Sequence, residues 1–445
     1  MAEITVGVDI GTSSVKAVAA DADGRVVARA RIPHAMNVPA PDLLEHDAAV
    51  AWVDGVRAAI DALGASARRD ALSIGVSAMV PSMCAVGADG RPVTPGLLYG
   101  DARGRTPGID AANPAGNREA MTFLSWCAAE APDARGYWPA QAVAAVAIGG
   151  PPVIDTSTAA MTWPLFDGKG WAPENLAELG VRADQMPQIV PAGQPAGRIG
   201  DLTIIGGAVD ALGEQIVTDV AKPGDVLVMC GTTLMVWIIT DRYIADSAPL
   251  WCIPWHVPGT FAVGGPSNAG GLFLGWVQRM LAPESADHAV DPSGVPVWAP
   301  FPRGERVPWH DHTRRASLHD VDLTMGARAV RRAAFEAAGF VVADILERSK
   351  LPVTRLVATG GGTRVPGWVQ AMADCTGRPV EVSAVQEGAA LGMAFLGRLA
   401  LGKESSLLEG RRWANIEKTV EPDAAWAAAC AARLERFREV SAQPS

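Results

Sequence analysis

This chain of 445 residues lacks closely spaced cysteine pairs. It also lacks an excess of positive charge and long apolar runs. The six cysteines include no Cys-x-x-Cys pair, so neither a zinc knot nor a disulfide scaffold is indicated. The formal net charge of −10 argues against a non-specific nucleic-acid binder and against a basic membrane-surface protein. No apolar tract reaches the ~20 residues that a membrane-spanning helix needs.

Charged residues are also scarce, at 19% of the chain, whereas apolar residues make up 49%. This balance is typical of a folded chain with large buried cores and excludes a disordered one. The N-terminal segment lacks the basic region and the apolar core of a signal peptide. We therefore expect a cytoplasmic protein with reduced thiols that associates with neither nucleic acid nor membrane.

A strand–turn–strand pattern occurs twice, once near the start of each half of the chain. The strands expected in the first half span residues 4–9, 15–20 and 26–31, and those in the second half span 226–230, 234–240 and 261–263. A small, hydroxyl-rich turn separates the first two strands of each set, and strands and helices alternate further along. The duplication predicts two α/β domains, residues 1–221 and 222–445.

The first of these turns has the composition of a phosphate-binding loop. Gly11 leaves backbone amides open to an anion, and the hydroxyls of Thr12 and Ser13 can hold phosphate oxygens. Asp9, at the end of its strand, is suited to hold Mg²⁺ directly or through water. Lys16 either adds positive charge to this site or is an exposed lysine of the hairpin.

Two glycine-containing turns in the second half complete the expected nucleotide site. The residues expected to bind ATP there are Gly231, Thr232, Thr233, Gly360, Gly361, Gly362 and Thr363. The first three form the counterpart of the N-terminal turn, and two such turns facing each other would clamp a nucleoside triphosphate. The remaining four follow a strand and precede a helix, where a ligand can contact bare backbone. A tight strand-to-helix turn explains that run equally well when it is taken alone.

Asp210 lies directly before a predicted helix that begins at Ala211. An aspartate at this position is a good helix N-cap, and it is also a carboxylate able to accept the proton of an attacking hydroxyl. The two roles are compatible. We expect the helix N-terminus to lower the pKa of Asp210 and keep it ionised.

Two other patterns indicate no chemistry. His310-Asp311-His312 has no third ligand at metal spacing, so we interpret these histidines as structural or superficial. No Gly-x-Ser-x-Gly sequence is present to support a serine hydrolase.

These elements, in this order, resemble the FGGY carbohydrate kinase family, within the superfamily of actin, sugar kinases and heat-shock ATPases. The resembling segments are residues 9–16, 45–47, 98–103, 155–167, 304–308, 360–363 and 387–392. The resemblance implies an α/β fold of two duplicated ribonuclease-H-like domains flanking an ATP cleft, with the sugar held mainly by the first domain. It also implies Mg²⁺ and ATP as cofactors, and a homodimer is compatible with it.

The resemblance assigns roles to single residues as well. Asp210 matches the catalytic base and a substrate contact, while Met79, Val80 and Asp101 match positions near the sugar. Segment 78–80 reads Ala-Met-Val where xylulokinases have Gln-Met-His, so two polar groups that a xylulose site would use are replaced. The sugar is therefore left open.

The sequence predicts ATP-dependent phosphorylation of a hydroxyl on a small sugar, polyol or sugar acid. Asp210 takes the proton, and Mg-ATP is held between the two Gly-Thr turns. One alternative is a sugar- or nucleotide-binding regulator that kept the fold and lost the chemistry. Another is a chaperone-like ATPase, which would need a peptide-binding domain that the predicted elements do not include.

Overall fold

The computed structural model describes residues 3–105, 118–281, 290–385 and 387–443, and these form two compact units. The first unit contains residues 3–105, 118–219 and 387–413, and the second contains residues 220–281, 290–385 and 414–443. The division after Asp219 lies close to the predicted boundary after residue 221. Residues 387–413 differ from the prediction, because we assigned them to the C-terminal domain and they pack in the first unit.

A mixed sheet in the order β11-β12-β5-β1-β2-β3 forms the centre of the first unit. Its strands are β1 (Ile4–Ile10), β2 (Ser14–Ala20), β3 (Val26–Pro33), β5 (Ala71–Ala78), β11 (Pro195–Ile199) and β12 (Leu202–Ile205), with β13 (Ala208–Val209) paired to β5. β1 runs antiparallel to β2 and parallel to β5, and both β12 and β13 run parallel to β5. The parallel strands therefore end at one common edge.

Helices and shorter strands surround this sheet. The helices are a π-helical turn (Ala49–Asp54), α1 (Gly55–Ala62), α2 (Ala65–Arg69), α3 (Glu119–Glu130), α4 (Ala140–Ala147), α5 (Thr156–Ala160), α6 (Pro173–Glu178), α7 (Asp210–Ile216) and α11 (Gly388–Ala400). The shorter strands are β4 (Glu45–His46), β6 (Ser82–Val86), β7 (Gly96–Leu98), β8 (Gly136–Trp138), β9 (Val153–Asp155) and β10 (Gln188–Val190).

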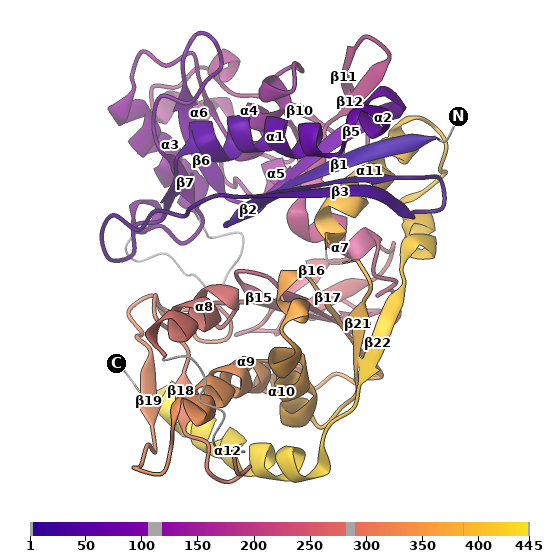
Figure 1. Cartoon of the computed structure of the whole chain (residues 1–445). Helices are drawn as coiled ribbons and strands as arrows, with labels where there is room; N and C mark the ends of the chain where they lie inside the picture. Colours follow the sequence, from indigo (N-terminus) through magenta and orange to yellow (C-terminus); the bar gives the residue numbers. More distant parts are fainter. Residues whose placement is uncertain (1–2, 106–117, 282–289, 386, 444–445) are drawn as a thin grey trace. The chain divides into compact units, whose positions relative to one another are not determined.

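Helix α11 explains why residues 387–413 join the first unit. Apart from Arg398 near its end, it is built of small and apolar residues, and a helix of that kind has to be buried. It packs on β1 and β5 (Figure 1). The approach is so close that a Cβ on Gly7 of β1 would lie 1.8 Å from the carbonyl oxygen of Ala390. Only a glycine in β1 allows the helix to lie there.

The second unit is built on a sheet in the order β16-β17-β15-β14-β20-β21-β22. Its strands are β14 (Asp225–Cys230), β15 (Leu234–Thr240), β16 (Trp251–Pro254), β17 (Phe261–Ser267), β20 (Arg355–Thr359), β21 (Val380–Ser383) and β22 (Ile416–Val420). β18 (Val297–Ala299) and β19 (Ser317–His319) form a separate pair. The helices are α8 (Gly271–Met280), α9 (Ala327–Ser349), α10 (Pro366–Thr376) and α12 (Ala424–Ala442).

The two sheets repeat one topology. The order β3-β2-β1-β5-β12 in the first unit corresponds to β17-β15-β14-β20-β21 in the second, and each neighbouring pair has the same relative direction. In both, the first three strands form an antiparallel meander and the next two run parallel to the first strand. The predicted duplication of an α/β ribonuclease-H-like domain is confirmed.

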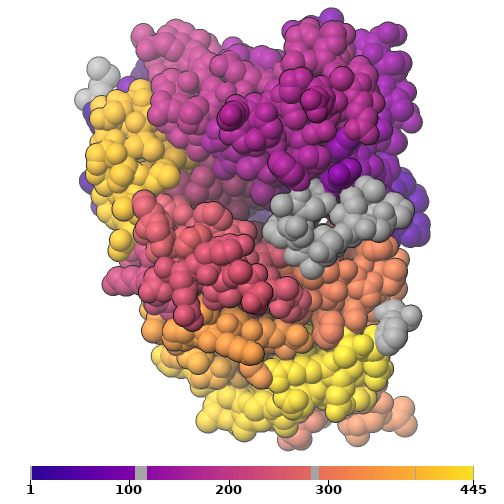
Figure 2. Space-filling view, turned by 180° about the vertical axis from the view of Figure 1, so that it is seen from behind, coloured from indigo at the N-terminus to yellow at the C-terminus, as the bar shows by residue number. Residues whose placement is uncertain are grey.

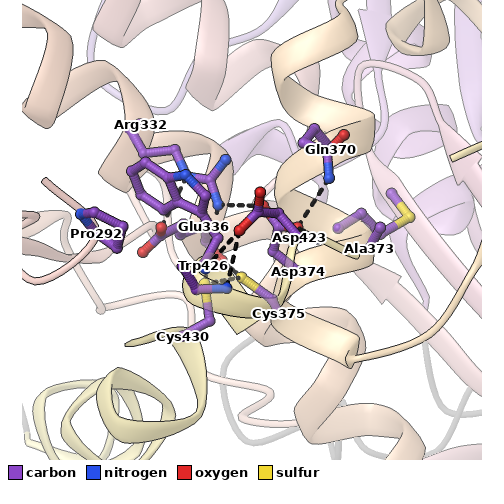
Figure 3. Close-up of polar contacts among 12 residues, drawn as sticks. Pro292, Arg332, Glu336, Gln370, Ala373, Asp374, Cys375, Asp423, Trp426 and Cys430 are labelled. Atoms are coloured by element: carbon purple, nitrogen blue, oxygen red, sulfur yellow. Dashed lines mark hydrogen bonds and ion pairs between the residues drawn. The ribbon is translucent and has the colours of Figure 1, made fainter. Parts of the chain in front are cut away.

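A buried polar cluster joins the helices of the second unit. α9 and α10 lie side by side (Figure 1), and one side of α12 is exposed as the bright yellow surface in Figure 2. Between the three helices, the fully buried carboxylate of Glu336 accepts hydrogen bonds from Arg332 (Figure 3) and from Arg433. Cys375 and Cys430 are adjacent there, with their sulfur atoms 3.6 Å apart. Among the described helices, none has the length and apolar character needed to cross a membrane.

Candidate functional site

The predicted catalytic and phosphate-binding segments of the first unit meet at one edge of its sheet. Ala78 of β5 is paired with Ile10 of β1 on one side and with Val209 of β13 on the other. The next residue along each strand is therefore Met79, Gly11 or Asp210, and the Met79 amide donates to the carbonyl of Ile10 at 3.2 Å. In open α/β sheets the carboxyl ends of parallel strands are where ligands bind.

The first predicted phosphate turn is a tight hairpin tip. The amide of Gly11 donates to the carbonyl of Ser14 at 3.1 Å, which closes the turn. Ser13 is exposed, whereas Thr12 is buried, and its hydroxyl lies 3.1 Å from the hydroxyl of Tyr99. The turn therefore presents exposed backbone and one exposed hydroxyl, with a second hydroxyl held by a neighbouring segment.

A buried histidine supports this turn from behind. The indole N–H of Trp52 donates to Nδ1 of His46 at 3.0 Å, so Nε2 carries the proton and donates to the Thr12 carbonyl at 2.9 Å. Burial lowers the pKa of His46 to about 4, so the ring is neutral at physiological pH. Sequence reasoning noticed this histidine only within segment 45–47 and gave it no role.

Lys16 is paired at the site instead of being an exposed lysine of the hairpin. Its Nζ lies 3.2 Å from Oδ2 of Asp9, and Ser77 Oγ donates to the other oxygen of Asp9 at 3.1 Å. Burial by itself would lower the pKa of Lys16, but the carboxylates of Asp9 and Glu214 outweigh that effect and raise it. Lys16 is therefore a firmly protonated ammonium group beside the turn.

Asp210 differs from the prediction in its helical position and in its pKa. It is the first residue of α7, and Val209 occupies the N-cap position. Its Oδ1 accepts from the Ala211 amide at 2.8 Å. Burial and the negative charge of Asp9 raise its pKa to about 7, against the lowering effects of that hydrogen bond and of Lys16. The predicted lowering was wrong because Asp210 is buried and, in addition, the sheet register brings a second carboxylate close to it.

Such a pKa is suited to proton transfer. A carboxyl group that titrates near pH 7 can accept a proton at neutral pH and release it again, which is the property that a general base requires. Asp210 as a whole residue is half-buried, at the sheet edge where β5 and β13 end.

Asp101, which was predicted to lie near the sugar, is held in a network of internal hydrogen bonds. Asp101 is fully buried, and its oxygens accept from the Leu44 amide and from the amide and guanidinium of Arg103. Arg103 also binds Glu45 at 2.8 Å and lies over the ring of Trp126 at 4.9 Å. Asp101 thus holds Arg103 in place, and Arg103, Glu45 and Trp126 are candidate contacts that sequence reasoning did not single out.

Met79 and Val80 occupy less polar positions. Met79 is buried and Val80 is half-buried directly after β5. Apolar side chains therefore adjoin Asp210 on the β5 side.

In the second unit, the two glycine-containing turns are neighbours. Met229 of β14 is paired with Thr359 of β20, so the turns that follow these parallel strands begin side by side. Gly360 has φ +89°, and a Cβ there would lie 3.0 Å from the carbonyl oxygen of Cys230. The close approach of the two turns therefore requires glycine at this position.

Each turn in the second unit is closed by its own hydrogen bonds. The Gly231 amide donates to the Thr233 carbonyl at 3.1 Å. The Thr363 hydroxyl donates to the Gly360 carbonyl at 2.8 Å, and a Cβ on Gly362 would clash with a tryptophan ring of α10, whereas Gly361 faces open space. Gly231 is exposed, so bare backbone is available at both turns.

The chemistry of the donors fits Mg²⁺ bound mainly through phosphates. Asp9 offers carboxylate oxygens, the type of ligand that Mg²⁺ prefers. Within the described ranges, no group of three His, Cys, Asp or Glu side chains is arranged to hold a metal ion by itself. Magnesium in nucleotide sites is commonly held by one or two carboxylates together with phosphate oxygens and water.

Two family models match this chain. Residues 4–109 match the N-terminal domain, and residues 226–401 match the C-terminal domain, of the FGGY family of carbohydrate kinases. The curated relatives include a xylulose kinase of Streptomyces coelicolor, 27% identical, with 92% of this chain and 90% of that protein covered. They also include a glycerol kinase of Bordetella parapertussis, 28% identical, with 98% and 96% covered.

The fold is shared with solved structures. The gluconate kinase of Lactobacillus acidophilus superposes with a TM-score of 0.78 at 22% identity, covering 100% of this chain and 99% of that one. Similarity at this level of identity establishes the two-domain fold. The compound in the printed name differs among these three proteins: a ketopentose, a polyol and a sugar acid.

Proposed function

Because the chain belongs to the FGGY family of carbohydrate kinases, which are phosphotransferases with an alcohol group as acceptor, we propose that it phosphorylates a hydroxyl of a small sugar, polyol or sugar acid with Mg-ATP. Asp210 is the general base in this proposal. The observation that carries it is the placement of Asp210 beside Gly11 and Met79 at one sheet edge, with a pKa of about 7.

The first step is removal of the acceptor proton. Asp210 accepts the proton of the attacking hydroxyl, which increases the nucleophilicity of that oxygen as it approaches the γ-phosphorus. Asp9 and Lys16 set the pKa of this base in opposite directions, because the anion raises it and the cation lowers it. Binding of a metal ion at Asp9 would offset the negative charge there and so favour the ionised form of Asp210.

The nucleotide phosphates are bound mainly by backbone in this proposal. The amides and hydroxyls of residues 11–13 and 231–233 donate to phosphate oxygens, and Lys16 adds positive charge at the first of these turns. Mg²⁺ held at Asp9 supplies charge neutralisation at the phosphates. Residues 360–363 contact the nucleoside end of ATP. In this assignment, residues 1–221 contribute the acceptor site and the base, and residues 222–445 contribute most nucleotide contacts.

The acceptor site combines one apolar and one polar side. Met79 and Val80 contact the carbon skeleton of the acceptor, and Arg103, held by Asp101 and Glu45, is directed at its hydroxyl or carboxylate groups. A guanidinium favours bidentate contacts with planar anions. For that reason, sugar acids belong in the acceptor panel together with ketopentoses and polyols.

An ADP-release assay over such a panel, with and without Mg²⁺, tests the proposal. We expect one class of acceptor to raise ADP release well above the acceptor-free rate. The Asp210→Asn variant should lose activity by about 10²–10⁴-fold, the range for a general base. Its affinity for ATP should be retained.

The outcomes separate the parts of the proposal. If every compound leaves ADP release at background, the assignment to these acceptors is wrong. If Asp210→Asn stays fully active, another residue is the base. Loss of ATP binding in that variant would instead indicate a structural defect.

A further inference from the structure

The second phosphate turn has a cation beside it to which neither the motifs nor the comparisons assign a role. Nη2 of Arg306 donates to Oγ1 of Thr233, the last residue of turn 231–233, at 2.9 Å. We propose that Arg306 binds a phosphate oxygen of the nucleotide together with this turn. The inference rests on the proposed function, since that function places phosphates at residues 231–233.

The loop that carries Arg306 is fixed on both sides of it. Before it, the carboxylate of Glu305 accepts from Ser267 Oγ at 2.7 Å and from the Asn268 amide at 2.8 Å. After it, the Val307 amide donates to the Pro266 carbonyl at 3.0 Å. These bonds join the loop to the end of β17.

That end of β17 is adjacent to the turn. Ser267 is paired with Leu234, the residue that directly follows Thr233. The guanidinium is therefore held beside the turn by backbone register and does not depend on a flexible surface contact. Placing a donor in this way lowers the entropy lost when it binds an anion.

Turn 231–233 needs a cation to bind phosphate, because the nearby backbone amides at the start of α8 already donate hydrogen bonds to the turn. Its residues, Gly231, Thr232 and Thr233, carry no charge. The first amides of α8, which would otherwise face an anion, donate to the turn itself: Gly271 to the Gly231 carbonyl at 2.8 Å and Leu272 to the Thr232 carbonyl at 3.1 Å. The α8 N-terminus thus stabilises the turn rather than a phosphate.

A guanidinium can hold the turn and bind a phosphate oxygen at the same time. It has five N–H donors in a planar fork, so a bond to Thr233 is compatible with further bonds to phosphate oxygens. The neighbouring carboxyl, Glu305, is fully buried, and burial raises its pKa to about 7 in spite of its hydrogen bonds. Near neutral pH, Glu305 is therefore partly protonated and cancels the charge of Arg306 incompletely.

The first unit has a comparable arrangement. Lys16 stands beside turn 11–13, as Arg306 stands beside turn 231–233. The two cations come from different places in the duplicated domains, because Lys16 lies on β2 and Arg306 on a loop after β18. Each repeat has therefore supplied its phosphate turn with a cation of its own.

Calorimetric binding of ATP and of adenosine to the full chain tests this proposal. In Arg306→Gln we expect the Kd for ATP to rise about 10- to 100-fold, as for loss of a charge-assisted hydrogen bond, and the Kd for adenosine to stay within about twofold. Arg306→Lys keeps the positive charge but loses the planar set of N–H donors, so its Kd for ATP should lie between those of the wild-type protein and Arg306→Gln. The matched control is Arg315→Gln, which removes an exposed arginine from the same region of the chain and should leave both affinities unchanged.

Rescue of a variant by added guanidinium distinguishes phosphate binding by Arg306 from a purely structural role. Millimolar guanidinium chloride should restore ATP affinity to Arg306→Ala, whereas potassium chloride at equal ionic strength should not. Equal weakening of ATP and adenosine binding, or unchanged ATP binding in Arg306→Gln, would overturn the proposal. The binding comparison needs no acceptor, so it remains decisive for Arg306 even if no compound in the acceptor panel is phosphorylated and the proposed function fails.

Discussion

The hydroxyl groups of Tyr99 and Thr12 lie 3.1 Å apart, and either can donate to the other. Tyr99 belongs to segment 98–103, which also contains Asp101. Thr12 belongs to the first phosphate turn. In this chain, therefore, a hydrogen bond joins the segment expected near the acceptor to the turn expected to bind phosphate.

Removing this hydroxyl should weaken ATP use. When Tyr99 donates, the Thr12 hydroxyl is free to donate in turn to a phosphate oxygen. We expect Tyr99→Phe to raise the KM for ATP about 2- to 10-fold, the equivalent of one neutral hydrogen bond. Steady-state kinetics at saturating acceptor measures the change.

A double-mutant cycle identifies the cause of that effect. In a Thr12→Val background the Tyr99→Phe substitution should have almost no further effect, because its partner is already gone. An equally large effect in both backgrounds would show that Tyr99 acts through some other contact.

The pH dependence of the reaction should report Asp210. Its pKa is about 7 in the metal-free protein, and a general base must be deprotonated, so kcat/KM for Mg-ATP, which reports the free enzyme, should rise with pH below about 7 and level off above it. Lys16 lowers this pKa, so Lys16→Met should move the rising limb to higher pH. A pH–rate profile of each protein checks this. A limb near pH 4 in the wild-type protein would mean that Asp210 is not held as described.

Local pairings explain how much of the fold could be predicted. The turns at Gly11 and Gly231 lie between strands that are consecutive in sequence and pair with each other, so composition and alternation were sufficient. The residues of helix α11 were placed in the C-terminal domain, whereas they pack in the first unit. Its partner β1 lies at the opposite end of the chain, and no local pattern encodes such a contact.

Contacts between distant parts of the chain also shape the candidate site, and local sequence patterns do not reveal them. The sequence shows Asp210 next to a helix, which predicts a lowered pKa. It does not show that the fold buries Asp210 and that β5 brings Asp9 close to it, and these two effects together raise the pKa. Likewise, Arg306 and Thr233 are separated by 73 residues, and only the pairing of β15 with β17 makes them neighbours.

The contact of α11 with β1 predicts a strong stability effect at one glycine. A Cβ on Gly7 would lie 1.8 Å from the Ala390 carbonyl, so the helix would have to move away from the sheet. We expect Gly7→Ala to destabilise the protein by about 1–3 kcal/mol or more, as for other overpacked sites. Urea denaturation measures the loss. Gly170→Ala is the control, because a Cβ at Gly170 meets no atom within 4 Å, and similar losses in both variants would refute the explanation.

The buried cluster of the second unit predicts that two glutamates of α9 differ in importance. Glu336 is fully buried and pairs with Arg332 (Figure 3) and with Arg433, whereas the side chain of Glu347 is 67% exposed and pairs with Arg438. Neutralising Glu336 leaves two arginines without their shared anion, so Glu336→Gln should cost about 3–5 kcal/mol of unfolding free energy. Glu347→Gln should cost less than about 1 kcal/mol, because water and salt screen an exposed pair. Denaturant unfolding of both variants measures the difference, and adding 0.5 M sodium chloride should reduce only the small effect at Glu347. Comparable losses in the two variants would show that the cluster around Glu336 is not the buried, mutually dependent network that its hydrogen bonds describe.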